Sequence, residues 1–309
     1  MLYIPIEALQ AFGKYLHSCG KLSSTIHCYS YDIAHFLQWL SDYRKPCYIE
    51  DSNDIQHYLD DLRTNYKLSQ NSLRRKLISI KMFFNYHCAQ LRPSMTPPTE
   101  HIPIPPRDDS LEDVLTPEDI EKLLASTTSP DNSYRSYRDP ALIALLCFEG
   151  IKSYELISLK WQDLNTHKHP NQHITFTIRI SGARKRCIVL SQNSSTYVQK
   201  LKEYTSQHPT FSSPQSPLFC PLQGKSALPR HSKMSRHGIK FMLYERANTI
   251  HIETLHSEKL RHYAITYQLA KGHSSYDIQK HLGVKRQESI ARHIRQQKRC
   301  AVSYTSALS

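Results

Sequence analysis

Six prolines between Arg92 and Ser110 constrain this chain more than any other feature. They stand at positions 93, 97, 98, 103, 105 and 106. Proline fixes φ and has no backbone N–H, so a stretch rich in it stays extended and belongs to neither a helix nor a central strand. A chain of 309 residues interrupted in this way is predicted to fold as two domains, 1–91 and 111–309, joined by a linker over 92–110.

The first domain is predicted to be helical, because its apolar residues recur with helical spacing. The clearest helix covers 72–91, where four apolar residues form one stripe that must face a core. They are Leu73, Leu77, Ile80 and Phe84. The other faces of this helix carry only positive charge. The cations are Arg74, Arg75, Lys76 and Lys81, and no acidic residue occurs from Asn71 to Arg92. This solvent face is interpreted as a surface for DNA phosphates, with a merely solvated face as the alternative.

The second domain is predicted to combine helices with a small β-sheet. Its first helix follows Thr116, which can cap it, while Pro117 suits the first helical position and Asp119 complements the positive end of the helix. An apolar helix is expected over 139–149, a β-hairpin over 173–180 and 186–190, a surface loop over 208–217, and further helices from about 235. The fold class is therefore mainly α with a small β-sheet (α+β).

The charge balance favours a polyanionic partner. The chain has 40 Lys and Arg against 27 Asp and Glu, a net charge of +13, and nucleic acid releases counterions when such a surface binds it. Charge that serves solubility alone is the alternative. Eight scattered cysteines show no metal-ligand spacing, so we expect no metal and no other cofactor. The chain shows no secretory signal and no stretch of about 20 apolar residues, which predicts a cytoplasmic, DNA-associated protein.

The C-terminal region has the pattern of a helix-turn-helix motif. Ser274 can cap a first helix, Asp277 lies in its first turn, and Gly283 suits a left-handed cap at its end. A strongly basic helix with a single acidic residue, Glu288, is expected to follow. Its cations are Lys285, Arg286, Arg292, Arg295, Lys298 and Arg299. Such a helix could enter the major groove of DNA, although many helical hairpins share this turn.

Motifs along nearly the whole chain resemble the tyrosine recombinase (phage integrase) family. The pattern from Leu22 to Trp39 and the segment Asn71 to Phe84 resemble the helical, SAM-like core-binding domain of that family. The segments Gly150 to Asp163, Lys259 to Thr266 and His281 to Gly283 resemble, in the family's order, three motifs of its catalytic domain. The resemblance implies a core-binding domain over 1–91 and a tyrosine-recombinase-type domain over 111–309.

The resemblance also implies a mechanism against which the residues can be compared. In the family a Tyr hydroxyl attacks a DNA phosphodiester, two Arg and two His-type residues hold the phosphate, and a Lys protonates the leaving oxygen. The corresponding positions here are occupied by Lys152, Ser181, Glu258, Arg261, Val284 and His293. Arg261 alone is retained, and the nucleophile position holds His293. Phosphoryl transfer depends on positioned positive charge, so these replacements predict a degenerate site with little or no autonomous cleavage.

The sequence is compatible with three interpretations. The first is a recombinase fold used for DNA binding, in recombination, integration or plasmid maintenance. The second is a working recombinase that uses a displaced nucleophile, either His293 itself or Tyr304. The third is a DNA-binding regulator that uses the helix-turn-helix.

The partner predicted in each case is double-stranded DNA, gripped by both domains as a clamp. A second copy of the chain, or an intact related recombinase, is a further expected partner, and no membrane is. The residues expected to contact DNA are Arg74, Arg75, Lys81, Lys152, Arg184, Lys185, Arg261 and His262.

Overall fold

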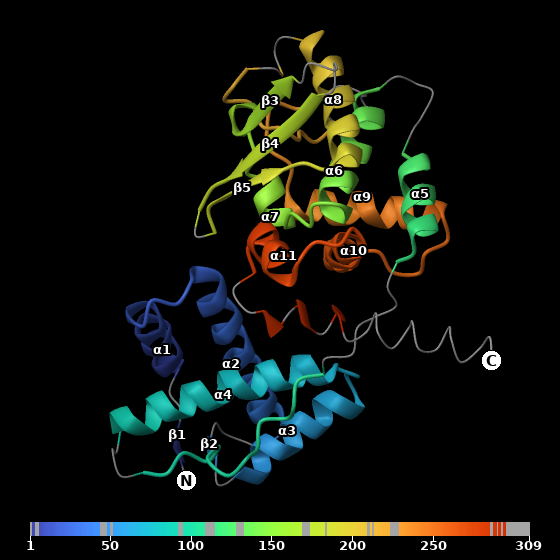
Figure 1. Cartoon of the computed structure of the whole chain (residues 1–309). Helices are drawn as coiled ribbons and strands as arrows, with labels where there is room; N and C mark the ends of the chain where they lie inside the picture. The colour runs from blue at the N-terminus through green and yellow to red at the C-terminus, as the bar shows by residue number, and fades with distance from the viewer. Residues whose placement is uncertain are drawn as a thin grey trace, which may run out of the picture. The chain divides into compact units, whose positions relative to one another are not determined.

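A computed structural model shows two compact units, Met1–Ser110 and Leu111–Ser309 (Figure 1). The residues that it describes are 2–3, 6–43, 48–49, 52–91, 95–108, 115–127, 133–168, 174–182, 184–208, 211, 213–222, 229–284, 287–288, 290–291 and 293–294. None of the helices in these ranges is long and apolar enough to cross a membrane.

Within its described residues the first unit has four helices and a short two-stranded sheet. The helices are α1 (Ile6–Ser18), α2 (Ser23–Tyr43), α3 (Ser52–Thr64) and α4 (Gln70–Leu91), and the antiparallel strands are β1 (Leu2–Tyr3) and β2 (Tyr48–Ile49). The strands are too short to show alternation in the sequence. The four-residue apolar stripe predicted on α4 is buried throughout and joins a core with aromatic side chains such as Phe12, Phe36 and Phe83, which confirms the prediction.

The positive face predicted on α4 is partly internal. Lys76 is only 6% exposed, and its ammonium lies 3.3 Å from a carboxylate oxygen of Asp32, which is fully buried on α2. Arg75 and the Ser79 hydroxyl donate to the other oxygen of Asp32. The interpretation of Lys76 as a solvent-facing cation is therefore wrong. Its long stem reaches inward to neutralise a buried charge, which helical periodicity alone does not reveal.

The proline-rich segment lies along α4 over residues 95–108. Gln70 donates to the Pro106 carbonyl (2.9 Å) and Asn71 to the Asp108 carbonyl (2.8 Å), while Arg74 donates to the Pro105 carbonyl. Lys81 donates to the Thr99 carbonyl. Proline lacks an N–H but keeps its carbonyl, so an extended segment of this kind can be held by donors from a neighbouring helix. Residues 95–108 are thus part of the packing of the first unit.

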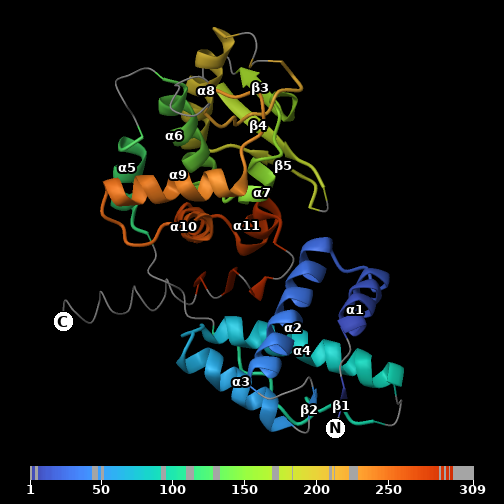
Figure 2. The ribbon, with the colours of Figure 1, turned by 180° about the vertical axis from the view of Figure 1, so that it is seen from behind.

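The second unit places helices around a three-stranded antiparallel sheet of order β3-β4-β5. The strands are β3 (Leu164–Lys168), β4 (Ile174–Ile180) and β5 (Arg186–Val189). The helices are α5 (Pro117–Ala125), α6 (Tyr134–Cys147), α7 (Ser153–Leu156), the 3-10 turn η1 (Trp161–Asp163), α8 (Gln192–Ser206), α9 (Arg236–Thr249), α10 (Ser257–Ala270) and α11 (Ser275–Leu282). In both views α8 lies beside α6 and next to the sheet, and α10 packs on α6 and α11 (Figures 1 and 2).

Several local predictions for this unit are confirmed. Thr116 and Asp119 form a capping box in which the Thr116 hydroxyl accepts from the Asp119 N–H (3.1 Å) and the Asp119 carboxylate from the Thr116 N–H (2.9 Å). The expected hairpin is β4 and β5. The mainly helical fold with a small sheet is thereby confirmed. The sequence did not indicate β3, because only Leu164 of its five residues is buried and the alternation of an inner face is missing.

A buried ion cluster joins α6 to α9. Asp139 is fully buried, and three arginines surround its carboxylate. They are Arg138, with its Nη2 at 2.6 Å, Arg246 at 3.0 Å and Arg135 at 3.3 Å. Arg246 also donates to the Ser126 carbonyl (3.0 Å) at the end of α5. A single carboxylate thus bonds to arginines of two helices, and Arg246 ties the end of a third helix to them.

Candidate functional site

Arg261, which the sequence predicts to be the retained arginine, is buried in the second unit. It lies on α10, is only 5% exposed, and donates through Nη2 to the Leu282 carbonyl (2.9 Å) and through Nη1 to the Gly150 carbonyl. Burial lowers the pKa of its guanidinium, and the negative charges of Glu258 and Glu155 act in the opposite direction. Arg261 therefore holds the loop after α6 against the end of α11.

Gly150 allows that loop to approach so closely. Its φ is +59°, in the left-handed region that favours glycine. A Cβ at this position would lie 2.4 Å from the Leu282 side chain and 3.1 Å from the Ala264 Cβ. Any side chain at position 150 would push α10 and α11 away from this loop, and therefore away from Lys152, which follows it.

Lys152 caps α7 and lies close to other cations. Its backbone N–H donates to a carboxylate oxygen of Glu155 (3.0 Å), and its ammonium lies 5.7 Å from the centre of the Tyr154 ring. Partial burial lowers the pKa of the Lys152 amine, and the charges of Arg261 and Arg184 lower it further. The structure thus brings together three of the residues predicted to contact phosphate.

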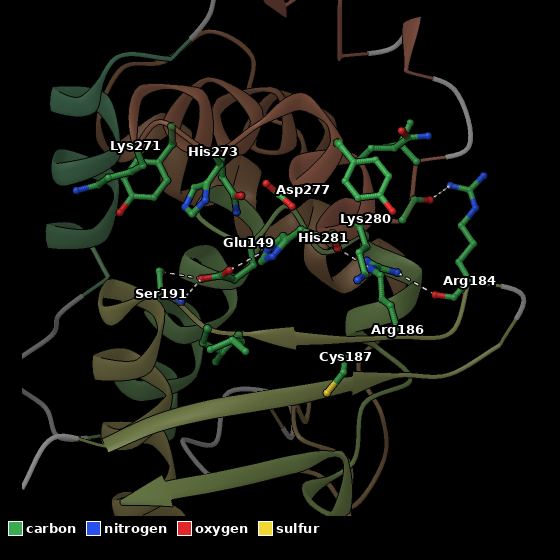
Figure 3. Close-up of a pocket in the computed structure, with 18 of the residues that line it drawn as sticks. Glu149, Arg184, Arg186, Cys187, Ser191, Lys271, His273, Asp277, Lys280 and His281 are labelled. Atoms are coloured by element: carbon green, nitrogen blue, oxygen red, sulfur yellow. Dashed lines mark hydrogen bonds and ion pairs between the residues drawn. The ribbon is translucent and has the colours of Figure 1, made fainter. Parts of the chain in front are cut away.

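Three arginines donate to the three successive carbonyls that end α11. Arg186 reaches the His281 carbonyl through Nε (2.7 Å), Arg261 the Leu282 carbonyl, and Arg184 the Gly283 carbonyl (3.0 Å). A helix leaves its last carbonyls without internal partners, and they form its negative end, which cations stabilise. Because the arginines come from the β4–β5 hairpin and from α10, they fix the end of α11 between both (Figure 3).

Glu155 balances this cluster. Its two carboxylate oxygens accept from Arg186 at 2.8 and 2.9 Å, in a forked pair whose side chains are 3% and 8% exposed. Burial acts to raise the pKa of Glu155, but the hydrogen bonds from Arg186 and from the Lys152 N–H outweigh it and lower the pKa. One carboxylate thereby links α7, β5 and, through Arg186, α11.

A second buried carboxylate, Glu149, lies nearby. One of its oxygens accepts from the Ser191 N–H (2.9 Å) and hydroxyl (2.7 Å), and the other lies 3.1 Å from Nε2 of His281 (Figure 3). Burial acts to raise the pKa of Glu149, but the hydrogen bonds from His281 and Ser191 outweigh it, so that the pKa is lowered. Glu149, Glu155 and Arg186 were missed in the sequence, since nothing in a charged residue's spacing reveals that it will be buried opposite another.

The other positions at which the sequence predicts a replaced catalytic residue have varied surroundings. Ser181 is exposed in the turn after β4, and Glu258 is exposed in the first turn of α10, where a negative charge favours the helix. Val284 packs against a cluster that contains Ile278 and Leu282. His293 is only 2% exposed, and the centre of its ring lies 4.9 Å from that of His262.

The predicted contacts outside this cluster are distributed over both units. Arg74, Arg75 and Lys81 lie on α4 of the first unit and bond to the neighbours described above. Lys185 is exposed at the hairpin, and His262 is half-buried on α10. Within the described ranges, no group of three His, Cys, Asp or Glu side chains could hold a metal ion.

The first half of the predicted helix-turn-helix is confirmed. The Ser274 hydroxyl accepts from the Asp277 N–H at the start of α11 (3.1 Å), and Gly283 ends the helix with φ +63°. Residues 288, 290–291 and 293–294 are helical. Tyr304 and the six cations expected on the second helix, Lys285, Arg286, Arg292, Arg295, Lys298 and Arg299, lie outside the described residues.

The Glu149 contacts predict a pH-dependent contribution to stability. A carboxyl whose pKa is lower in the folded than in the unfolded chain stabilises the fold above its unfolded pKa, and the contribution is lost as pH falls through the folded value. Glu149→Gln is therefore expected to lower the free energy of unfolding at neutral pH by about 1–3 kcal/mol, and by less as pH falls below the ordinary value of 4.5. Urea unfolding at a series of pH values measures this. Glu253→Gln, at an exposed position, is the matched control, and an equal loss at all pH values would contradict the prediction.

Family models match both units. The model described as "Phage integrase family" matches residues 113–299, and "Phage integrase, N-terminal SAM-like domain" matches residues 8–91. The chain is 30% identical to tyrosine recombinase XerD of Listeria monocytogenes over 187 residues, 60% of this chain and 60% of that protein, and so spans less than two thirds of its length. It is 24% identical to tyrosine recombinase XerC of Staphylococcus aureus over 264 residues, 84% of this chain and 81% of that protein.

Solved structures share the fold. The XerH site-specific recombinase bound to its palindromic difH substrate matches with a TM-score of 0.71 and 19% identity, over 91% of this chain and 79% of that one. A lambda integrase dimer bound to a COC' core site matches with a TM-score of 0.67 and 15% identity, over 93% and 76% of the two chains. Because the matching family model covers well over half of the sequence, the chain belongs to the phage integrase family of tyrosine recombinases.

Proposed function

We propose that this protein binds double-stranded DNA and acts in DNA recombination, integration or plasmid maintenance, with little or no strand cleavage of its own. The observation that carries the proposal is the buried His293 at the nucleophile position, packed against His262. A ring that is 2% exposed cannot present a nitrogen to a phosphodiester without leaving its packing. The XerH recombinase is bound to a difH substrate and the lambda integrase dimer to a COC' core site, and we propose a partner of this kind, double-stranded DNA, for this chain.

DNA binding is supported by the cations that remain. Burial lowers the pKa of the Lys152 amine, and the positive charges of Arg261 and Arg184 lie close enough to lower it further, as expected where positive charge is gathered. Such a cluster loses its mutual repulsion when a phosphate neutralises it. On α4, Arg75 is 42% exposed although it contacts Asp32, and a guanidinium has five donors, so it can contact a phosphate as well.

The side chains that stand at the predicted catalytic positions support a loss of cleavage. Lys152 carries charge but cannot form the two parallel hydrogen bonds of an arginine fork. Ser181 has no ammonium with which to protonate a leaving oxygen, and Glu258 brings negative charge where a phosphate would be held. Glu258 and Val284 instead suit a helix start and an apolar cluster. These positions are therefore occupied by residues that favour folding over phosphoryl transfer.

A working partner would let such a protein take part in recombination. We infer that a second copy, or an intact related recombinase, assembles with it on paired DNA sites. The sequence also resembles the integrase-like proteins of the chlamydial virulence plasmid, and this likeness favours plasmid maintenance among the outcomes. A regulator that uses the helix-turn-helix is the second candidate, which the caps of α11 at Ser274 and Gly283 support.

A suicide substrate tests the absence of cleavage directly. We expect no covalent protein–DNA adduct from a nicked duplex that traps phosphotyrosyl or phosphohistidyl intermediates, because no exposed nucleophile stands at the replaced position. The readout is a shift of labelled DNA in a denaturing gel. An adduct that disappears in His293→Ala, or in Tyr304→Phe, would show that the site cleaves and would name the nucleophile.

The same preparation should bind duplex with a steep dependence on salt. If six to ten phosphates are contacted, affinity falls roughly 10³- to 10⁵-fold between 50 and 200 mM salt. Electrophoretic or anisotropy titrations at several salt concentrations measure the slope. Binding without an adduct supports the proposal, whereas a protein that ignores duplex at low salt contradicts it.

A further inference from the structure

A groove of about 1230 Å³ runs along β5 in the second unit. One wall is formed by β5 and the residues that flank it, and the other by the end of α10, the turn after it and α11 (Figure 3). Small-molecule sites usually measure roughly 300–1,000 Å³. The groove therefore has room for a segment of polypeptide.

Apolar side chains in the groove lie open to solvent. Val189 is 67% exposed and Tyr276 is 63% exposed, on opposite walls, and the half-buried Tyr267 and Val284 also line the groove. Large exposed apolar groups that line one concavity favour a partner with apolar side chains of its own. The sugar-phosphate backbone of a duplex offers none, so this lining favours a protein partner over DNA.

The charge that remains at the rim is positive. Lys185, Lys271 and Lys280 are all exposed, and none of them has an ion pair within the described part of the chain. The Lys271 ammonium lies 5.7 Å from the centre of the Tyr267 ring, which joins a cation to the apolar lining. The two acidic residues of the groove are engaged locally, Glu149 with Ser191 and His281 and Asp277 with Ser274. The rim therefore complements carboxylates.

The strand wall favours an extended occupant. Among the described strands β5 pairs with β4 alone, so no strand pairs with the other edge of β5, which lies on the side of the groove. An added segment can form backbone hydrogen bonds with such an edge while alternate side chains enter the groove. The chain's own residues 295–309 carry three cations and no acidic side chain, so their charge does not complement the rim.

We propose that this groove binds an extended acidic segment of a partner protein, in which carboxylate side chains alternate with apolar ones. The carboxylates meet Lys271 and Lys280, and the apolar side chains cover Val189 and Tyr276. The surface is separate from the residues proposed to contact DNA, apart from Arg184 and Lys185 at its end.

The binding of an acidic segment is tested by fluorescence anisotropy with the whole 309-residue chain and a labelled peptide in which glutamate and valine alternate. The expected result is binding of this peptide and none of a lysine–valine peptide. Lys271→Glu combined with Lys280→Glu should weaken binding about tenfold. The matched control combines Lys122→Glu and Lys200→Glu, which change the same charge at exposed positions outside the groove and should leave binding unchanged. Equal binding of both peptides, or equal effects of both double variants, would overturn the proposal.

A second measurement does not depend on variants. Cys187 is exposed and lines the groove, whereas Cys19 is exposed in the first unit. The bound glutamate–valine peptide should slow the alkylation of Cys187 and leave the rate of alkylation at Cys19 unchanged. Mass spectrometry of the proteolytic fragments that contain each cysteine measures the two rates. An unchanged rate at Cys187 under saturating peptide would refute the location.

Competition experiments distinguish the acidic segment from two other possible occupants of the groove. A duplex that displaces the acidic peptide, and whose own affinity falls equally in the Lys271 and Lys280 double variant, would make the groove a DNA surface instead. A synthetic peptide of residues 295–309 that displaces it would assign the groove to a second copy of the chain. Either result overturns the acidic partner, and failure of both to compete supports it.

Discussion

Separating the two units at residue 110 is expected to weaken duplex binding by at least about 10²-fold compared with the intact chain. Each unit carries proposed phosphate contacts, with Arg74 and Lys81 in the first and Lys152 and Arg261 in the second. A linked second contact forms at the high local concentration that the first one creates, which typically raises avidity 10²- to 10⁴-fold without any new interaction.

Residues 1–110 and 111–309, produced separately, allow the measurement by anisotropy with one duplex at one salt concentration. The boundary lies after the proline-rich segment because residues 95–108 pack along α4 and would lose their support if the cut preceded them. Mixing the two pieces should not restore the affinity of the intact chain. If 111–309 alone binds as tightly as the whole protein, the two-unit clamp is wrong and the DNA contacts of α4 are dispensable.

Asp139→Ala is expected to lower the free energy of unfolding by about 3–5 kcal/mol, the cost typical of breaking a buried ion pair from one side. Three guanidiniums converge on this carboxylate, and Arg138 and Arg246 are only 6% and 15% exposed. Without Asp139 they remain positive, close together and partly desolvated, because an arginine cannot lose its proton under these conditions.

Thermal and urea unfolding measure this effect. Asp60→Ala is the matched control: it breaks an Asp–Arg pair whose side chains are 50% and 62% exposed, so the expected change is within about 1 kcal/mol. A change of similar size in both variants would mean that the cluster relaxes or admits water, and that burial does not set its contribution.

Local features were predictable where short-range physics determines them. The apolar stripe of α4, the capping box at Thr116, the β4–β5 hairpin and the left-handed end of α11 at Gly283 each depend on a few neighbouring residues, and the structure has all of them. Lys76 and β3 were not predictable in this way. The position of Lys76 depends on Asp32, which is 44 residues away in the sequence, and β3 depends on pairing with β4.

The candidate site was predictable only as a set of positions. Motif order predicts roles for Lys152 and Arg261, but it does not reveal the contacts that connect them. Arg186 contacts both Glu155 and the end of α11 at His281, although these two residues are 126 positions apart in the sequence. Opposite charges that are buried at such a separation leave no periodic pattern in the sequence.

The end of α11 has one further consequence for any polyanion that reaches this site. Its three carbonyls already accept hydrogen bonds from three arginines, so an incoming phosphate meets donors whose orientation was fixed during folding. To use them fully it must take the place of a peptide oxygen. Recognition here is then an exchange of one acceptor for another, and its outcome depends on which of the two holds the arginines more tightly.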